Sequence, residues 1–218
     1  MSVKIGLKYI DIWQESMEEQ IREYEKEEIV KGQIVFYGPS NFTRWSEKYG
    51  MTPLREALKG KSGAPCVINR GFGSSCAEHQ LYYYPRTIRP LEPKVLVYSF
   101  TGNGSAFGYS IEESWELAQR VIAYARTDFP DIRIYISGFN PSFKDFTCVQ
   151  LEQIKRFSSW MQAFVSITPN CHFFEPLSYE PLLRKDIYVE DGVHFNKEGY
   201  DLYAEFFRQQ LKAELDEF

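Results

Sequence analysis

The chain contains 218 residues, of which 44% are hydrophobic and 25% are charged, and its net charge is −5. These values are those of an ordinary globular protein with a substantial core, and they exclude intrinsic disorder, collagen and coiled-coil arrays. The weak acidic balance gives no support to a nucleic-acid partner. We expect residues 1–218 to form one domain, with residues 1–30 as an N-terminal helical extension packed against it.

The cysteine pattern and the amino terminus bear on the compartment. The cysteines are Cys66, Cys76, Cys148 and Cys171. None of them forms a Cys-x-x-Cys pair, so a zinc or redox motif lacks its usual support and a reduced protein is the simplest interpretation. Residues 1–10 do not resemble a secretory signal, and no run of about 18 apolar residues would cross a membrane. We therefore expect a cytoplasmic protein without a membrane partner, and the sequence does not indicate its oligomeric state.

The predicted elements alternate between helices and short strands. Residues 12–29 carry apolar side chains at roughly helical spacing, which predicts an amphipathic N-terminal helix. Five short apolar runs, each followed by glycine or proline, predict buried strands at residues 34–37, 66–69, 94–100, 132–137 and 171–175. Further helices are predicted at 111–127, at 147–167 with Thr147 as its cap, and at 197–215. This order predicts an α/β fold, a three-layer flavodoxin-like sandwich with a central five-stranded parallel sheet and helices on both faces.

Ligands of such sheets bind at the carboxyl ends of the strands, so the loops after the predicted strands form the candidate site. Ser40 follows the first strand and Gly38-Pro39, which suits a nucleophile whose neighbouring N–H groups would stabilise an oxyanion. The same pattern also fits an ordinary helix cap, which is its commoner role.

The loops after the second and third predicted strands offer further groups. Gly71 and Gly73 would let the backbone approach a ligand closely, although each also fits a turn with positive φ. Asn103, in the loop 101–104, supplies an amide that would either donate to an oxyanion or close a local turn.

The loop before the last predicted helix contains Asp191 and, three residues later, His194. An imidazole acts as a general base on serine only when its tautomer and direction are held, commonly by a carboxylate on Nδ1. Asp191 would do this from a tight loop containing Gly192, and a surface aspartate beside a capping histidine is the alternative. The serine, the glycine loop, the asparagine and the Asp–His pair are all expected at one edge of one sheet. Their joint occurrence favours a shared site over four independent coincidences.

From residue 34 to residue 207 the chain resembles the SGNH hydrolases, also called GDSL-type esterases and lipases. A strand followed by Gly38-Pro39-Ser40 matches the first family block, and this match implies that Ser40 is the nucleophile. The Asp-x-x-His block before the last helix implies that Asp191 and His194 complete a catalytic triad.

The same resemblance implies an oxyanion hole. The second family block, at residues 69–74, implies Gly73 as a backbone donor, with Gly71 as the lesser choice. The third block implies the amide of Asn103, and the N–H of Ser40 is the remaining donor. Two positions depart from the family pattern: Pro39 stands where the family has aspartate, and Gly104 stands where an aspartate braces the third block. Pro39 removes one backbone donor beside the nucleophile.

The implied activity is hydrolysis of short-chain acyl esters through an acyl-serine, on O-acetyl groups of carbohydrates or on small molecules. The expected partner is therefore a small-molecule or oligosaccharide ester, with no cofactor and no metal. His79 and His172 lie in different predicted elements without ligand spacing, so we expect structural roles for both. The tyrosines at 82–84 fall in a predicted helix and favour a core or interface role over a substrate pocket.

Two other functions stay open at this point. Residues 99–105 would suit a phosphate loop, which would make the chain a flavodoxin-like flavin- or phosphate-binding module. That function leaves Ser40, Gly73 and the Asp191–His194 pair unexplained. The second is a catalytically weak, binding-only member of the hydrolase fold, motivated by the two departures at residues 39 and 104.

Overall fold

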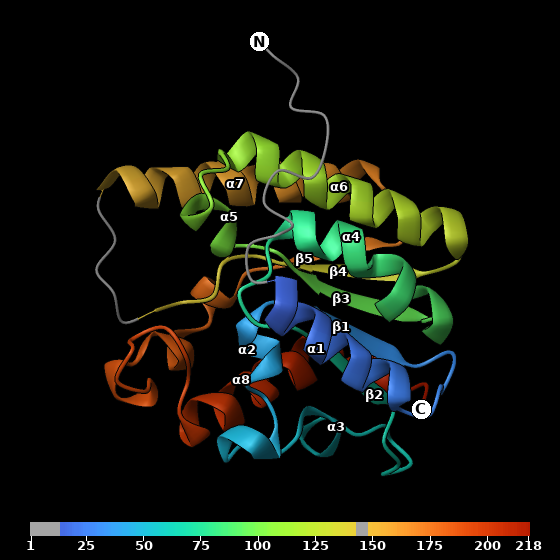
Figure 1. Ribbon diagram of the computed structural model, residues 1–218. Helices are drawn as coiled ribbons and strands as arrows, with labels where there is room; N and C mark the ends of the chain where they lie inside the picture. The colour runs from blue at the N-terminus through green and yellow to red at the C-terminus, as the bar shows by residue number, and fades with distance from the viewer. Residues whose placement is uncertain (1–13, 143–147) are drawn as a thin grey trace.

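A central sheet of five parallel strands organises the protein (Figure 1), and the computed structural model describes residues 14–142 and 148–218. The strands are β1 (Ile34–Gly38), β2 (Val67–Gly71), β3 (Val95–Ser99), β4 (Arg133–Ser137) and β5 (Cys171–Phe174). Their order across the sheet is β2-β1-β3-β4-β5. The order reverses between β1 and β3, and such a reversal opens a crevice at the carboxyl ends of the strands.

The helices of the described residues connect the strands and extend beyond them at both ends. They are α1 (Gln14–Lys26), α2 (Ser40–Thr43), α3 (Leu54–Ala57), α4 (Ala77–Thr87), α5 (Asn103–Ala106), α6 (Ile111–Asp128), α7 (Cys148–Ile167), α8 (Lys197–Gln210) and α9 (Lys212–Leu215). Short 3-10 helices occur at Glu47–Tyr49, Arg89–Leu91, Pro176–Ser178, Glu180–Leu183 and Lys185–Ile187. In this part of the chain, no helix combines the length and apolar character needed to cross a membrane.

Strand β1 shows how the sheet supplies two separate cores. Val35 and Tyr37 pack with α1, α4, α6 and α7, whereas Ile34 and Phe36 pack with α2, α3 and α8 on the opposite face. All four side chains are completely buried. Because successive side chains of a strand point to opposite faces, one short apolar run serves both layers. The result is the three-layer α/β sandwich that the sequence predicts, with helices above and below the sheet (Figure 1).

Some elements differ from their expected form. The helix expected at 197–215 is interrupted at Leu211, whose fully buried side chain belongs to the second core. His172 lies in a strand as predicted, but its side chain is exposed because β5 is the edge strand, and its ring stacks on Tyr135 with centroids 4.6 Å apart. The cap expected at Thr147 and the first part of the N-terminal extension, residues 1–13, lie outside the described residues.

The three consecutive tyrosines lie in α4, where helical geometry points them in different directions. Tyr83 and Tyr84 are buried in the first core, and Tyr82 is 43% exposed. His79 is also in α4 and is fully buried. These side chains therefore contribute to packing between α4 and its neighbours.

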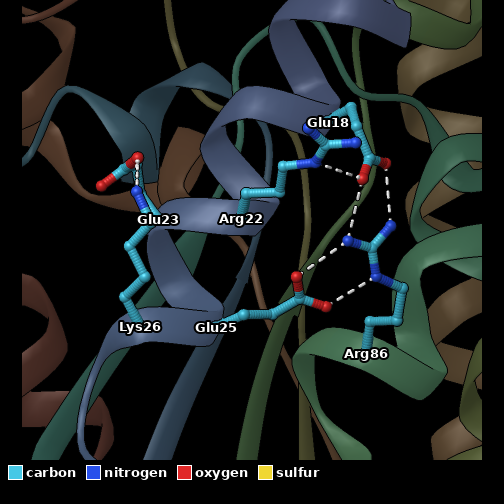
Figure 2. A network of polar contacts seen from close by, with 6 residues as sticks. All are labelled: Glu18, Arg22, Glu23, Glu25, Lys26 and Arg86. Atoms are coloured by element: carbon cyan, nitrogen blue, oxygen red, sulfur yellow. Dashed lines mark hydrogen bonds and ion pairs between the residues drawn. The ribbon is translucent and has the colours of Figure 1, made fainter.

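Helix α1 is docked on α4 by both apolar and charged contacts. Met17 and Ile21 are buried in the first core. Figure 2 shows Arg86 of α4 between Glu18 and Glu25 of α1, with N–O distances of 2.7 to 2.9 Å. The hydrogen bond from Arg86 lowers the pKa of Glu18 to about 2, so this contact is ionic at neutral pH.

Candidate active site

Ser40 is the first residue of α2 and stands two residues after Gly38, the carboxyl end of β1. The N-cap of this helix is Pro39, and the side chain of Ser40 does not act as a cap. Its Oγ lies 2.7 Å from Nε2 of His194 instead. The backbone N–H of Ser40, at the first helical position, has no carbonyl four residues earlier in the helix to bond to. The capping interpretation is therefore replaced by a serine paired with an imidazole.

His194 and Asp191 belong to one short loop that closes on itself. Tyr188 and Phe195 form an antiparallel bridge at its base, and the N–H of Val189 donates to the carbonyl of His194 at 2.9 Å. Gly192 turns the loop with φ of +66°, a region that other residues rarely adopt. The acid and the imidazole are thus held in one rigid turn before α8.

The carboxylate of Asp191 uses both oxygens within this loop. Oδ1 accepts the N–H groups of Val193 and His194 at 2.8 and 2.9 Å. Oδ2 lies 2.6 Å from Nδ1 of His194. Partial burial alone would raise the pKa of Asp191, but the N–H groups and the imidazole of His194 outweigh it and lower that pKa to about 2. A carboxylate that stays ionised can orient the ring and stabilise it when it becomes an imidazolium.

Arg44 is a charged neighbour of this pair that the sequence argument missed. Its Nη1 lies 3.3 Å from Oδ2 of Asp191, the same oxygen that faces His194. Its guanidinium also lies over the ring of Tyr49, 5.6 Å from the centroid. The available signal was its place four residues after Ser40, one helical turn away from the expected nucleophile.

The loop after β2 gives Gly71 and Gly73 different surroundings. The N–H of Gly71 already donates to Oδ1 of Asn69 at 2.9 Å. A Cβ on Gly71 would lie 2.5 Å from the backbone nitrogen of Thr43, whereas one on Gly73 would meet nothing within 4 Å. Neither glycine has positive φ, and Ser74 takes that conformation with φ of +60°. Gly71 is needed for close contact with α2, and Gly73 faces open space.

Strand register places Gly73 level with Ser40. Gly38 of β1 pairs with Gly71 of β2, so Ser40 and Gly73 each stand two residues beyond the paired strand ends. The N–H of Phe72 donates to the carbonyl of Gly38 at 3.0 Å and continues the pairing past the strands. Backbone N–H groups from two adjacent strands are therefore available at one edge of the sheet.

Asn103 is the first residue of α5, after β3. Its Nδ2 donates to the carbonyl of Ser75 at 2.9 Å, a contact with the neighbouring loop and not with its own turn. An amide nitrogen carries two hydrogens, so one remains for a ligand. The carbonyl of Ser75 therefore holds the side chain of Asn103 in place. At Gly104 a Cβ would lie 2.5 Å from Oγ of Ser114, so α6 packs close to the position where the family has a side chain.

The other departure, Pro39, is compatible with the local geometry. Its φ of −80° is within the range of proline, and its carbonyl accepts the N–H groups of Phe42 and Thr43 at 3.0 and 3.3 Å. A residue at the N-cap needs no N–H of its own for the helix. The backbone donor of the family aspartate is absent, while that of Ser40 remains.

Asn69, which lies in β2, is a further residue to which the sequence analysis gave no role. Its Nδ2 donates to the carbonyl of Phe42 in α2 at 2.7 Å, while its Oδ1 holds the N–H of Gly71. It therefore fastens the helix that carries Ser40 to the loop that carries Gly73. An asparagine at a strand end followed by glycine two residues later was the usable signal.

A pocket of about 450 Å³ opens beside Ser40 and Asn103, at the reversal point between β1 and β3. Its apolar wall includes Phe100, Phe139, Ile154 and Phe157. Its polar groups include Ser114, Asn140 and Gln153. Among the described residues, Gly73 is not part of the lining, so the pocket extends away from the β2 side of Ser40.

The contacts of the loop at residues 99–105 and the distribution of metal-binding side chains bear on the phosphate and metal alternatives. In the loop that the alternative function would use to bind phosphate, Oγ of Ser105 donates to the carbonyl of Gly102 at 3.0 Å, and Nδ2 of Asn103 donates to the carbonyl of Ser75. Over residues 14–142 and 148–218, no group of three or more His, Cys, Asp or Glu side chains could hold a metal ion.

Comparison with solved structures shows the same fold in several esterases. A GDSL-like lipase from Bacteroides thetaiotaomicron VPI-5482 has a TM-score of 0.69 and 16% identity, covering 90% of this chain and 97% of that one. The psychrotrophic esterase EstA from Pseudoalteromonas sp. has a TM-score of 0.65 and 13% identity, covering 84% and 99%. The acetyl xylan esterase AlAXEase has a TM-score of 0.62 and 17% identity, covering 82% and 99%.

No curated protein sequence matches this chain at a significant level. The model of the GDSL-like lipase/acylhydrolase family, however, matches residues 37–202. That range includes Ser40, Gly73, Asn103, Asp191 and His194. The resemblance expected from the sequence is thereby confirmed, and the chain belongs to the GDSL-like lipase/acylhydrolase family.

Proposed function

We propose that this protein hydrolyses carboxylic esters of short acyl groups through an acyl-enzyme formed at Ser40. One observation carries the proposal: Ser40 Oγ, His194 and Asp191 form a continuous series with distances of 2.7 and 2.6 Å. The series ends at a pocket that also contains Asn103. A hydroxyl, an imidazole and a carboxylate in this relation are the parts needed to activate a serine.

In the first half of the reaction, Nε2 of His194 takes the proton from Ser40 as Oγ attacks the ester carbonyl carbon. The carbonyl oxygen becomes an oxyanion, which the N–H groups of Ser40 and Gly73 and the amide of Asn103 would hold. The tetrahedral carbon then expels the alcohol oxygen, and His194 returns its proton to that oxygen. The alcohol leaves, and the acyl group remains on Ser40.

In the second half, a water molecule attacks the acyl carbon and gives one proton to Nε2 of His194. The oxyanion forms again in the same place and then collapses, breaking the bond to Oγ. His194 returns the proton to Ser40, and a carboxylic acid is released. Asp191 remains ionised throughout, because its role is to orient the ring and stabilise the imidazolium.

The pocket supports a small substrate with some polar character. Its volume of about 450 Å³ lies in the lower part of the range for small-molecule sites. Phe100 and Phe157 would contact an acyl group, while Asn140 and Gln153 would hydrogen-bond to hydroxyls of a sugar or a similar alcohol. A related fold occurs in an acetyl xylan esterase, which supports O-acetyl carbohydrates as one substrate class.

A panel of p-nitrophenyl acetate, butyrate and octanoate tests the acyl length. We expect kcat/KM to be highest for acetate or butyrate and lower by about tenfold or more for octanoate, because a long apolar chain would leave polar lining groups such as Asn140 and Gln153 without partners. The rate of Ser40→Ala on each ester gives the background to subtract. A clear preference for octanoate would contradict the short-acyl substrate.

Replacing Asn103 by alanine tests the oxyanion hole. Loss of one such donor lowers kcat by about 10²–10³, so we expect a severe but incomplete loss of turnover with KM little changed. Gln209→Ala removes an exposed amide on α8, whose Nε2 donates to Oε1 of Glu205 at 3.2 Å away from the pocket, and serves as the control. Equal turnover in Asn103→Ala and the wild type would remove Asn103 from the proposed site.

A further inference from the structure

Helix α1 contacts the end of β2 as well as α4. The hydroxyl of Tyr24 donates a hydrogen bond to the carbonyl of Gly71, the last residue of β2. One turn later, Oε2 of Glu27 accepts a hydrogen bond from Nη1 of Arg70 at 2.7 Å. The guanidinium of Arg70 lies over the ring of Tyr24, 4.7 Å from its centroid. Tyr24 of α1 and Glu27, the first residue after this helix, therefore hold the last two residues of the strand that leads to Gly73.

The segment from Gly71 to Gly73 depends on such backbone contacts. Gly73 has no side chain, and the space around its Cβ position is empty within 4 Å, so side-chain packing does not fix it. The next residue, Ser74, has φ of +60°, which reverses the chain direction immediately afterwards. The direction of the Gly73 N–H therefore follows from how the peptide groups of Gly71 and Phe72 are held.

Both polar groups of Gly71 are held by side chains, from opposite sides. Its N–H donates to Asn69, which is bonded in turn to α2. Its carbonyl accepts from Tyr24 of α1. Phe72, completely buried, is fixed through its N–H to β1. The loop is thus clamped between the helix that carries Ser40 and the N-terminal helix.

Tyr24 and Arg70 contact each other and their neighbours on the α1 side of this clamp. Arg70 is only 4% exposed, and it is satisfied by Glu27, by the ring of Tyr24 and by the carbonyl of Asn69 at 3.0 Å. Burial raises the pKa of Tyr24 well above its usual value, so its hydroxyl remains a donor at every assay pH. The Arg86 contacts in Figure 2 hold the same helix on α4.

We propose that Tyr24 is a positioning residue of the oxyanion hole, through which helix α1 orients the peptide that leads to the Gly73 N–H. The inference rests on the proposed function, because an oxyanion forms only if an ester is attacked at Ser40. Helix α1 lies outside residues 37–202, the range that the family model matches. The contact between Tyr24 and Gly71 therefore connects a helix outside the matched range with the proposed oxyanion hole inside it.

The test is Tyr24→Phe, which removes the hydroxyl and keeps the ring that Arg70 covers. We expect kcat on p-nitrophenyl acetate to fall by about tenfold with KM unchanged within twofold, since a misdirected donor weakens only the oxyanion contact. Affinity for a trifluoromethyl ketone, which forms a tetrahedral oxyanion adduct on serine, should fall by the same factor as kcat/KM. A merely structural tyrosine would leave both quantities unchanged in the folded protein.

Tyr135→Phe is the matched control. Its hydroxyl donates to Oε1 of Glu214 at 2.7 Å, a buried hydrogen bond that joins β4 to α9 in the other core. We expect this variant to lower the melting temperature and to leave kcat and inhibitor affinity unchanged. Tyr24→Phe and Tyr135→Phe therefore separate an effect on the oxyanion hole from the general effect of losing a buried tyrosine hydroxyl.

The outcomes distinguish the inference from the function on which it rests. If the wild type is active and Tyr24→Phe matches it in kcat and in ketone affinity, the positioning role of Tyr24 is overturned and the esterase function stands. The same holds if KM rises while kcat is unchanged. If the wild type is no faster than Ser40→Ala, the proposed function fails and the inference fails with it.

Discussion

Replacing Ser40 by alanine should abolish ester hydrolysis while the protein stays folded. The Oγ that faces Nε2 of His194 at 2.7 Å is the only atom removed, and it lies at the surface of a pocket. In serine hydrolases the loss of the nucleophile lowers kcat by about 10⁶, so turnover of p-nitrophenyl acetate should drop to background. Circular dichroism and the melting temperature should remain close to those of the wild type.

A fluorophosphonate probe adds a direct measurement of the same residue. Intact-mass analysis should show one adduct on the wild type and none on Ser40→Ala. Ser159→Ala, an exposed serine on α7 bonded only to the carbonyl of Arg156, should label like the wild type. A wild type that neither labels nor hydrolyses esters would indicate a binding-only member of the family. Labelling that survives Ser40→Ala would place the nucleophile elsewhere.

Replacing Asp191 by asparagine should lower kcat by about 10⁴, although the loop remains closed. An asparagine oxygen can still accept the N–H groups of Val193 and His194 that Oδ1 accepts now. Its amide nitrogen, however, would face Nδ1 of His194 as a donor. The imidazole would then carry its proton on Nε2 and could no longer accept the proton of Ser40.

The pH dependence of ester hydrolysis is a second test of the role of Asp191. The pKa of Asp191 is lowered to about 2, so this carboxylate is ionised above about pH 4. Protonation of Asp191 should therefore contribute nothing to any loss of wild-type activity above about pH 4. Asp201→Asn, an exposed aspartate on α8 paired with Lys197, should keep the wild-type rate and profile. Near-normal turnover in Asp191→Asn would exclude the proposed role of Asp191.

The fold was predictable because its signals are local. Each strand is a short apolar run ended by a residue that breaks the strand, and Ile34–Gly38 shows the whole pattern in five residues. The interruption at Leu211 was not predictable, because the helical pattern continues through it and only tertiary burial sets the break. The exposure of His172 depends on which strand lies at the edge of the sheet. No local sequence pattern predicts the order of the strands.

Some residues of the candidate site also have local sequence signals, whereas the roles of others depend on tertiary contacts. Ser40, Asp191 and His194 were accessible from the sequence because each stands beside a turn signal at a fixed spacing. The sequence signals of Arg44 and Asn69 are weaker, because the roles of these residues arise from contacts with residues that are far away in sequence: Asp191 for the first and Phe42 for the second. Tyr24 belongs to the same class, since an amphipathic helix pattern identifies its buried side but not the backbone carbonyl that it meets.

The two halves of the proposed site also differ in when they can form during folding. The turn that carries Asp191 and His194 closes through contacts within eight residues, from Tyr188 to Phe195. Ser40 and His194, by contrast, are 154 positions apart. Such distant pairing bears the entropy of closing a long loop and is formed late in chains with many non-local contacts. Recovery of ester hydrolysis on refolding should therefore lag behind recovery of helical signal, which makes the activity a reporter of the final assembly of the sheet.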